Sequence, residues 1–413
     1  IIYHISFPSI TNMDNNKTIN VGLIGFGVVG SGVVDLFLKN KNTDINLKTI
    51  VVKDPKKPRK PEFSNITTDA SKVIDDPDID IVVQLIGGYE PAKKYIIRSI
   101  KNKKHVITAN KAVISEYGSE IFKLADENNV NVGFEAAVAG GIPIINPLLD
   151  QLTLGKITNI TGILNGTTNF ILTKMSEGMD YKSALKIAQE KGFAEADPSF
   201  DVEGNDAAQK ISIIASLAFG KWINPKEVYC EGITEITPMD IEYAKDLGYV
   251  IKLLAIAGKT ETGDIDIRVH PALIKKSHRL AKVNDEFNAI RIQGTPFDEY
   301  FNVGKGAGQG PTAFSVYYDI IKTAKMIRTG LIRKIKVDVN DMKIVDQSNV
   351  VTEGYLRLYL QHIPSALHSV IDVLSKHEWN IKNSIQRGGP KYEMEVNGVK
   401  CLPDIITHEP LPF

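Results

Sequence analysis

The feature that most constrains the fold is a glycine turn set between an apolar run and a helix-like segment. The run INVGLIGFG is typical of a buried strand, and the segment VVGSGVVDLFLKN after it has a helical pattern. Gly25, Gly27 and Gly30 form the pattern G-x-G-x-x-G at this junction. The first glycine permits a tight turn, the second lets the backbone approach a pyrophosphate, and the third allows the helix to pack closely on the strand.

This turn predicts a dinucleotide site, because the N–H groups at the start of a helix are free to bind phosphate. The residues expected to contact the dinucleotide are Gly25, Phe26, Gly27, Val28, Val29 and Gly30. The alternative is a glycine-rich turn that serves only packing.

Strand-like and helix-like segments alternate beyond the turn. Apolar runs typical of strands occupy residues 47–54, 78–88, 105–111 and 130–138. Helix-like segments such as PAKKYIIRSIKNK separate them. The alternation predicts an α/β fold with a Rossmann-type, doubly wound parallel sheet. After Gly141 the rhythm changes to mixed strands and helices, which predicts an α+β lobe with two edge-like strands over 288–303.

We expect the chain to contain several regions. They are a disordered extension over 1–13, an NAD(P)-binding Rossmann domain over 14–134, a linker and dimerisation region over 135–150 and 305–342, a substrate domain over 151–304, and a small βαβ unit over 350–413. The extension includes the first methionine, Met13, and residues 1–12 lack the basic start and the cleavage site of a signal peptide.

The end of the second strand indicates which nucleotide is bound. A site selective for NAD usually has a carboxylate there, hydrogen-bonded to the ribose hydroxyl. Here Lys53 comes first, and Asp54, Lys56, Lys57 and Arg59 follow. A cationic strand end suits a 2′-phosphate, so NADP(H) is favoured, whereas Asp54 keeps NAD(H) possible. The alternative is a solvated basic loop without contact to phosphate.

Two further strand ends point into the same crevice. Gly87 and Gly88 end the third strand, where backbone can pass close to ribose and nicotinamide, since ligands lie beyond the carboxyl ends of the strands. Lys111 follows the fourth strand and is expected to contact the cofactor, the substrate or both. Gly306 lies in a glycine-rich segment of the second lobe and is a further candidate for cofactor contact. The alternatives are an exposed loop lysine and a flexible hinge.

The stretch GFAEADPSFDVEGNDAAQK combines an acidic loop with the start of a helix. Asp206 and Lys210 are four residues apart and share one helix face. The helix continues as ISIIASLAFG, which is apolar nearly all round and should be buried. A lysine at the mouth of a buried helix, held by carboxylates, can serve as a proton donor, and the acidic loop suits a substrate ammonium group. The alternative is a surface ion pair.

Composition excludes several classes of function. Lys+Arg and Asp+Glu both number 49, which argues against a general nucleic-acid or membrane-surface role. The two cysteines, Cys230 and Cys401, cannot form a disulfide framework and fit a reducing, cytoplasmic location. No apolar run reaches membrane-spanning length, and no zinc-ligand spacing appears. We therefore expect a small-molecule substrate and no nucleic-acid or membrane partner.

Several motifs in their order along the chain resemble homoserine dehydrogenases over roughly residues 19–340. They read VGLIGFGVVGSGV, VVQLIGG, TANKAVIS, EAAVAGGIPII, GILNGTTNFIL, GFAEADPSFDVEGNDAAQK and GAGQGPTAFSV. The resemblance implies NAD(P)-dependent interconversion of L-aspartate 4-semialdehyde and L-homoserine, a step in threonine, methionine and isoleucine biosynthesis. It also implies a homodimer or homotetramer.

The resemblance assigns roles to matching residues of this chain. Lys210 matches the proton donor, and Lys111 matches the lysine near the nicotinamide and the substrate. The residues that match the lining of the substrate pocket are Glu195, Asp201, Asp206 and Thr167. A sodium ion or another monovalent cation is also implied, with hard oxygen ligands that are largely backbone. The positions that match the cation site are Glu135, Val138, Gly140 and Ile142.

The tail over 350–413 resembles a partial ACT domain, an amino-acid-sensing βαββαβ unit. Its first turn reads QHIPS, where the ACT pattern has an acidic residue followed by x-Pro-Gly. The chain stops soon after IITHE, so the last helix and strand of the pattern are missing. We therefore expect the unit to be truncated, degenerate or completed by a partner subunit, and we do not assume feedback control through it.

The sequence is also compatible with two other functions. One is a related amino-acid dehydrogenase that acts on another oxo substrate. The other is a regulator that senses NADP without turnover, although the intact Lys111, Lys210, Glu195 and Asp206 argue against it.

Overall fold

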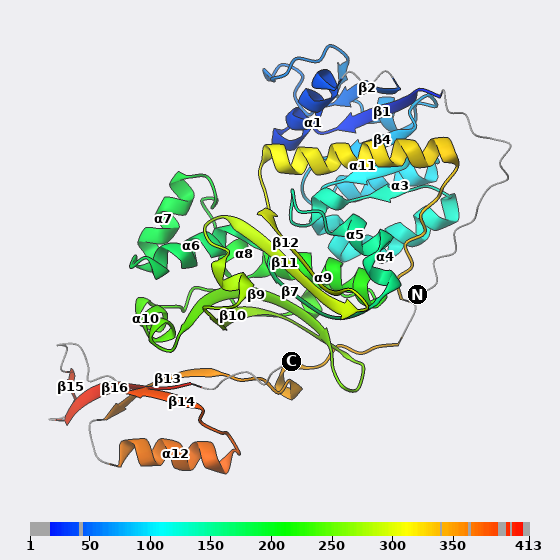
Figure 1. Cartoon of the computed structure of the whole chain (residues 1–413). Helices are drawn as coiled ribbons and strands as arrows, with labels where there is room; N and C mark the ends of the chain where they lie inside the picture. The colour runs from blue at the N-terminus through cyan, green and yellow to red at the C-terminus, as the bar shows by residue number, and fades with distance from the viewer. Residues whose placement is uncertain are drawn as a thin grey trace. The chain divides into compact units, whose positions relative to one another are not determined.

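The computed structural model describes residues 17–40, 44–338, 341–361, 365–386, 394–396 and 399–407 (Figure 1). The predicted extension over 1–13 lies outside these residues. The chain forms two compact units: a main unit of Ile1–Glu242 with Gly248–Val345, and a tail unit of Tyr243–Leu247 with Asp346–Phe413. Among the described residues, no helix is both long and apolar enough to cross a membrane.

The first sheet of the main unit is wholly parallel and has the strand order β3-β2-β1-β4-β5-β6. Its strands are β1 (Ile19–Ile24), β2 (Ile45–Val51), β3 (Ile66–Thr67), β4 (Ile81–Gln84), β5 (His105–Thr108) and β6 (Val132–Gly133). The predicted Rossmann-type doubly wound sheet is therefore confirmed. The strand order reverses between β1 and β4, and such a switch point opens a crevice at the carboxyl ends of the strands.

Helices cover this sheet on both faces. They are α1 (Val28–Lys39), α2 (Ser71–Ile74), α3 (Ala92–Lys101), α4 (Lys111–Asn128) and, from much later in the chain, α11 (Gln309–Thr329). Within the predicted linker and dimerisation region over 305–342, α11 lies against α1 and the same sheet (Figure 1). Val316 and Ile320 of α11 are fully buried with Leu23 and Val33 in one core. The returning helix is therefore a structural layer of the nucleotide-binding part.

The second sheet is mixed and has the strand order β12-β11-β7-β9-β10-β8. Its strands are β7 (Lys156–Ile163), β8 (Tyr229–Cys230), β9 (Tyr249–Lys259), β10 (Ile265–Lys275), β11 (Phe287–Thr295) and β12 (Asp298–Lys305). Only the β8–β10 pair is parallel. The prediction of two edge-like strands over 288–303 is wrong for β11, which pairs with β7 on one side and with β12 on the other.

Further helices and 3₁₀ turns lie along the chain. The helices are α5 (Ile145–Asp150), α6 (Gly166–Ser176), α7 (Tyr181–Glu190), α8 (Ser199–Val202), α9 (Asn205–Phe219) and α10 (Pro238–Asp246). The 3₁₀ turns are η2 (Glu135–Ala137), η3 (Leu152–Leu154), η4 (Pro225–Glu227), η5 (Arg279–Lys282) and η6 (Gln347–Asn349). Helix α9 contacts strands β7, β9 and β10 on one side and α4 on the other, and it is buried from Asp206 to Phe219, as predicted.

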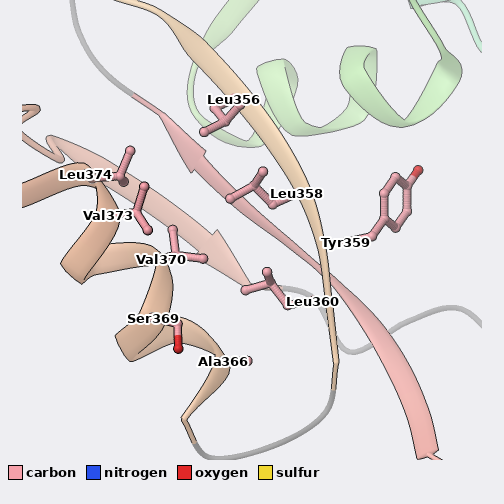
Figure 2. Close-up of a pocket in the computed structure, with 9 residues that line it drawn as sticks. All are labelled: Leu356, Leu358, Tyr359, Leu360, Ala366, Ser369, Val370, Val373 and Leu374. Carbon is pink, nitrogen blue, oxygen red and sulfur yellow. The ribbon is translucent and has the colours of Figure 1, made fainter. Parts of the chain in front are cut away.

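The tail unit is a small antiparallel sheet with one helix. Its elements are β13 (Tyr355–Gln361), α12 (Ala366–Lys376), β14 (Asn383–Gln386), β15 (Met394–Val396) and β16 (Val399–Thr407). β16 pairs with each of the other three strands. Leu356, Leu358 and Leu360 face Val370 and Val373 of the helix across an apolar groove of about 530 Å³, whereas the neighbouring Tyr359 points away (Figure 2). Residues 362–364 of the unusual turn lie outside the described part, and the ACT resemblance stays a prediction.

Candidate active site between the two sheets

The glycine turn after β1 is shaped to receive a ligand. Gly25 has a φ of +108°, and its N–H donates to the carbonyl oxygen of Val51 at 3.0 Å. A Cβ at Gly30 would overlap the Gly25 carbonyl oxygen, so the third glycine allows close packing of α1. A Cβ at Gly27 would meet no atom within 4 Å, so the second glycine keeps space open. Gly27 caps α1 without a side-chain hydrogen bond, which leaves N–H groups at the helix start available to phosphate.

The Asn110 side chain holds the ends of β4 and β5 together, a role that the sequence pattern does not predict. The Asn110 amide nitrogen donates to the carbonyl oxygens of Ile86 at 3.1 Å and of Gly88 at 2.7 Å. Its amide oxygen accepts from the Val113 N–H at 3.1 Å and so caps α4, the helix that begins at Lys111. An asparagine directly before a helix is an N-cap signal, but the bonds to the β4 loop come from residues far away in the sequence.

A cavity of about 410 Å³ opens at these strand ends. It receives side chains and backbone from both parts of the main unit. Residues that line it include Val29, Gly87, Gly88 and Lys111 from the nucleotide-binding part, and Phe200 and Gln209 from the second part. The cavity therefore joins the glycine turn, the predicted nicotinamide strand end and the start of α9.

Three charged side chains meet beside this cavity. Asp206 Oδ1 lies 2.8 Å from Lys111 Nζ, and Asp206 Oδ2 lies 2.7 Å from Lys210 Nζ. Lys210 Nζ also donates to the carbonyl oxygen of Leu164 at 2.7 Å. Lys210 is only 8% exposed, whereas the Lys111 side chain is 31% exposed and lies 5.5 Å from the ring centre of Phe200. One buried carboxylate thus joins a lysine from each part of the main unit.

The two carboxyl groups of the site differ in their electrostatics. Burial alone would raise the pKa of Asp206, but the Lys210 and Lys111 ammonium groups outweigh burial and hold that pKa well below its usual range. Burial, and then the charge of Asp206, raise the pKa of Asp201. Asp206 is therefore a fixed anion, and Asp201 takes up a proton more readily.

Asn165 links these two carboxylates, a role that the sequence pattern does not predict. Its amide nitrogen donates to Asp201 Oδ1 at 2.7 Å and to Asp206 Oδ2 at 2.9 Å. Its amide oxygen accepts from the Thr168 N–H at 2.8 Å and caps α6. The run LNGTT contains this N-cap signal, but not the second role of the same side chain.

Two predicted substrate residues lie apart from this cluster. Thr167 Oγ1 donates to the carbonyl oxygen of Phe193 at 2.7 Å and thereby anchors the acidic loop. Glu195 is exposed on that loop, and its backbone carbonyl oxygen accepts from the Gln189 side chain at 3.2 Å. Within the described residues, no hydrogen bond or ion pair joins the Glu195 carboxylate to Asp206 or Lys210.

The basic loop after β2 folds back toward the glycine turn. The Arg59 guanidinium lies 5.7 Å from the ring centre of Phe26, which belongs to the turn. Arg59 also donates to the carbonyl oxygens of Lys57 at 2.8 Å and Asp54 at 2.7 Å. The Asp54 carboxylate accepts from the Lys56 N–H at 2.9 Å, so its own loop engages it. Lys53 remains exposed at the strand end.

The predicted cation positions lie where the chain leaves the first sheet. The Glu135 carboxylate accepts the backbone N–H groups of Ile144, Ile145 and Asn146 at 2.6 to 2.8 Å and so holds the start of α5. The Gly140 carbonyl oxygen accepts from Ser315 Oγ at 2.7 Å. In the part of the chain that the structure describes, no three His, Cys, Asp or Glu side chains form a metal-binding group.

Gly306 serves close packing in the structure. A Cβ there would overlap the side-chain amide of Asn288, and a Cβ at Gly140 would meet the Gly306 carbonyl at 2.5 Å. The described wall of the 410 Å³ cavity does not include Gly306. Its predicted contact with the cofactor stays a prediction.

Comparisons with known proteins bear on both parts of the main unit. A family model described as "Homoserine dehydrogenase, NAD binding domain" matches residues 25–135, and one described as "Homoserine dehydrogenase" matches residues 143–321. The chain is 48% identical over 323 residues to a homoserine dehydrogenase of Synechocystis sp., which covers 75% of this chain and 74% of the relative. It is 40% identical over 381 residues to a homoserine dehydrogenase of Bacillus subtilis, which covers 90% of this chain and 88% of the relative.

Solved structures agree with these matches. A homoserine dehydrogenase from Thiobacillus denitrificans superposes with a TM-score of 0.87 at 37% identity and covers 94% of this chain and 91% of its own. A hyperthermophilic archaeal homoserine dehydrogenase, solved in complex with NADPH, superposes with a TM-score of 0.63 at 27% identity. The archaeal alignment covers 74% of this chain and 98% of the archaeal one.

Proposed function

Since the chain belongs to the homoserine dehydrogenase family, we propose that its crevice interconverts L-aspartate 4-semialdehyde and L-homoserine by hydride transfer. The observation that carries the proposal is the shared carboxylate of Asp206, which holds Lys111 and Lys210 at 2.8 and 2.7 Å beside the cavity. A nicotinamide cofactor, when bound, supplies or accepts the hydride. The open space at Gly27 and the uncapped start of α1 fit its pyrophosphate.

Lys210 is the proton donor of this proposal. Reduction of an aldehyde places negative charge on its oxygen, and an ammonium group at that oxygen stabilises the charge and donates the proton. Lys210 has one N–H bound by Leu164 and another by Asp206, so a third remains for the substrate. Asp206 cannot readily take the proton because its pKa is held low. Its carboxylate therefore orients the Lys210 ammonium group.

Lys111 and the acidic loop bind the substrate in this proposal. Lys111 is more exposed than Lys210 and approaches Asp206 from the nucleotide-binding part, so it places charge where substrate and nicotinamide meet. Asp201 is the proposed partner of the substrate ammonium, because Asn165 links it directly to Asp206 beside the cavity. Glu195 on the acidic loop, and Thr167 of α6, which anchors that loop at Phe193, keep their proposed roles as pocket residues.

We propose NADP(H) as the preferred cofactor. Lys53 is exposed at the end of β2, and Arg59 stacks over Phe26 of the glycine turn, so two cations lie where a 2′-phosphate would be bound. The Asp54 carboxylate is engaged by its own loop, which weakens the case for NAD(H). The archaeal structure solved with NADPH supports the same preference.

A monovalent cation and a homodimer complete the proposal. The cation would be held by backbone oxygens of Glu135, Val138, Gly140 and Ile142. The buried Glu135 carboxylate, which is bound only by neutral N–H groups in its described contacts, supports a cation nearby. Phe314 and Tyr318 share one face of α11 and are 62% and 46% exposed, which supports an interface between two copies. A cytoplasmic location is likewise proposed, from the cysteine content.

A direct assay tests the substrate and cofactor together. The purified chain is mixed with NADPH and a panel of oxo acids, and nicotinamide absorbance is followed. We expect turnover with L-aspartate 4-semialdehyde well above that with the other oxo acids, and slower turnover when NADH replaces NADPH. Faster turnover of another oxo acid would favour the related-dehydrogenase alternative. Cofactor binding without any turnover would favour the NADP-sensing alternative.

A further inference from the structure

Gln209 carries a polar atom that the folded chain leaves unused. The residue is 8% exposed, lies in α9 directly before Lys210 and lines the 410 Å³ cavity. Its amide oxygen is buried and accepts no hydrogen bond from the described residues. Buried amide oxygens in folded proteins almost always have a partner, so an unpaired one at the wall of a ligand crevice points to a ligand donor.

The other end of the same amide is already engaged. Burial raises the pKa of Tyr89, and Glu116 raises it further, whereas the Gln209 side chain opposes this shift through a hydrogen bond. An amide lowers the pKa of a phenol by donating an N–H to its oxygen, so the nitrogen end of Gln209 faces Tyr89. In this orientation the amide oxygen is the end without a partner among the described residues.

The position and charge of this acceptor select among possible donors. Gly87 and Gly88 lie on the same cavity, at the strand end where the nicotinamide half of a dinucleotide is expected. A substrate ammonium is better matched by the charged Asp201 and Asp206 than by a neutral amide. The adenine amine belongs at the end of β2, near Lys53. The nicotinamide carboxamide remains as the neutral N–H donor of the right kind.

We propose that the Gln209 amide oxygen accepts a hydrogen bond from the carboxamide N–H of the nicotinamide cofactor and so fixes the rotation of the ring. Gln209 and Lys210 are consecutive residues of one buried helix. The bond therefore sets the position of the hydride-carrying ring relative to the proton donor. Gln209 is a positioning residue for hydride transfer, and this role depends on the function proposed above.

The test compares two cofactors on one variant. Homoserine oxidation is measured with NADP and with its acetylpyridine analogue, in which a methyl group replaces the carboxamide nitrogen and removes the N–H donor. In the wild type, kcat/KM should favour NADP once the intrinsic reactivity of the two rings is allowed for. In Gln209→Met, which keeps the side-chain volume but has no amide oxygen, the preference for NADP over the analogue should fall by about 5- to 10-fold, the size of one neutral hydrogen bond. This fall should appear both in the ratio of the two kcat/KM values and in the ratio of the two Kd values from direct binding titration without homoserine.

Two controls keep this test decisive. Gln151 is exposed and outside the crevice, so Gln151→Met should leave the ratio unchanged. Gln209→Glu retains an acceptor oxygen and should keep most of the discrimination even if its overall rate falls. An unchanged ratio in Gln209→Met would overturn the assignment, as would a loss confined to the KM of homoserine. Absence of homoserine oxidation in the wild type would instead contradict the proposed function itself.

Discussion

At the scale of single residues, one carboxylate organises the site. Asp206 is 4% exposed and bonds to Lys111, Lys210 and Asn165, which come from three different elements. The sequence predicts the pair of Asp206 and Lys210 from their spacing on one helix. It also places Lys111 in the crevice, because a residue after a parallel strand lies at that edge. It cannot show Asn165, because the contact depends on how β7 and α9 pack.

Replacing this carboxylate should impair chemistry more than binding. In Asp206→Asn the two ammonium groups lose their shared anion, so we expect kcat to fall about 100-fold while the Kd for NADPH stays within about threefold. Asp201→Asn should instead act mainly on the KM of homoserine. Steady-state kinetics with fluorescence titration of NADPH separate these effects. Equal losses of kcat in the two variants would contradict the distinct roles.

The three glycines of the turn give a matched pair of substitutions. Gly30→Ala forces a Cβ against the Gly25 carbonyl and should lower the free energy of unfolding by about 1–3 kcal/mol. Gly27→Ala meets open space, so the free energy of unfolding should change by less than about 0.5 kcal/mol, while affinity for NADPH falls at least about tenfold. Urea unfolding and NADPH titration check the pair. Normal NADPH affinity in Gly27→Ala would show that the pyrophosphate of the cofactor does not bind at this turn.

At the scale of elements, sequence patterns predict most strands but not all of the strands and helices that pack beside them. The parallel strands and the buried α9 follow from apolar runs and from helical periodicity. β3 has two residues, Ile66–Thr67, too few for any period to appear. β11 has an alternating pattern that also suits an edge strand. Alternation shows which side chains share a face of the sheet, but it does not show how many strands pair with β11. The packing of α11 on α1 depends on Gly32, where Ala313 lies in close contact, and this long-range contact has no local signal.

The contact between α4 and the chain after α9 should be sensitive to volume. Gly118 of α4 leaves room for the Trp222 ring, and Trp222 Nε1 donates to the Ser115 carbonyl oxygen at 3.2 Å. A methyl group in Gly118→Ala would overlap that ring, so we expect a loss of about 1–3 kcal/mol in the free energy of unfolding. Gly178→Ala is a poor comparison because its φ is positive, whereas Gly310→Ala, in open space within α11, is a suitable control. An unchanged free energy of unfolding in Gly118→Ala would show that the Trp222 ring can move away.

The junction of α11 with η2 should make stability depend on pH. Burial, and then the nearby Glu135, raise the pKa of Asp319 to about 7. The folded state thus holds a proton that the unfolded chain releases above its ordinary pKa of 3.8. The resulting contribution to the free energy of unfolding is present at low pH and is lost as the pH rises through about 7. A pKa difference of about three units limits this contribution to about 4 kcal/mol.

Asp319→Asn removes this titration. Between pH 5 and pH 8, the free energy of unfolding of the wild type should therefore fall relative to that of the variant. The Asn side chain cannot accept from both Glu135 N–H and the Asn146 amide, so a constant loss at every pH is also expected. Denaturant unfolding at several pH values measures the slope. A difference that does not vary with pH would refute the raised pKa of Asp319.

At the scale of the whole molecule, the proposed catalytic residues lie in the main unit. The glycine turn, the cavity and the three charged side chains all belong to residues before Val345. The archaeal relative aligns over nearly its full length with only 74% of this chain. Removal of residues 350–413 should therefore leave kcat within about twofold. A tenfold loss in a folded, truncated protein would show that the tail supports turnover.

The most direct measurement is the turnover of Lys210→Ala with NADPH and L-aspartate 4-semialdehyde, compared with Lys186→Ala, whose lysine is 77% exposed on α7. We expect the first variant to lose at least about 100-fold in kcat with unchanged NADPH affinity, and the second to match the wild type. Near-normal turnover of Lys210→Ala would contradict the assignment of its ammonium group as proton donor.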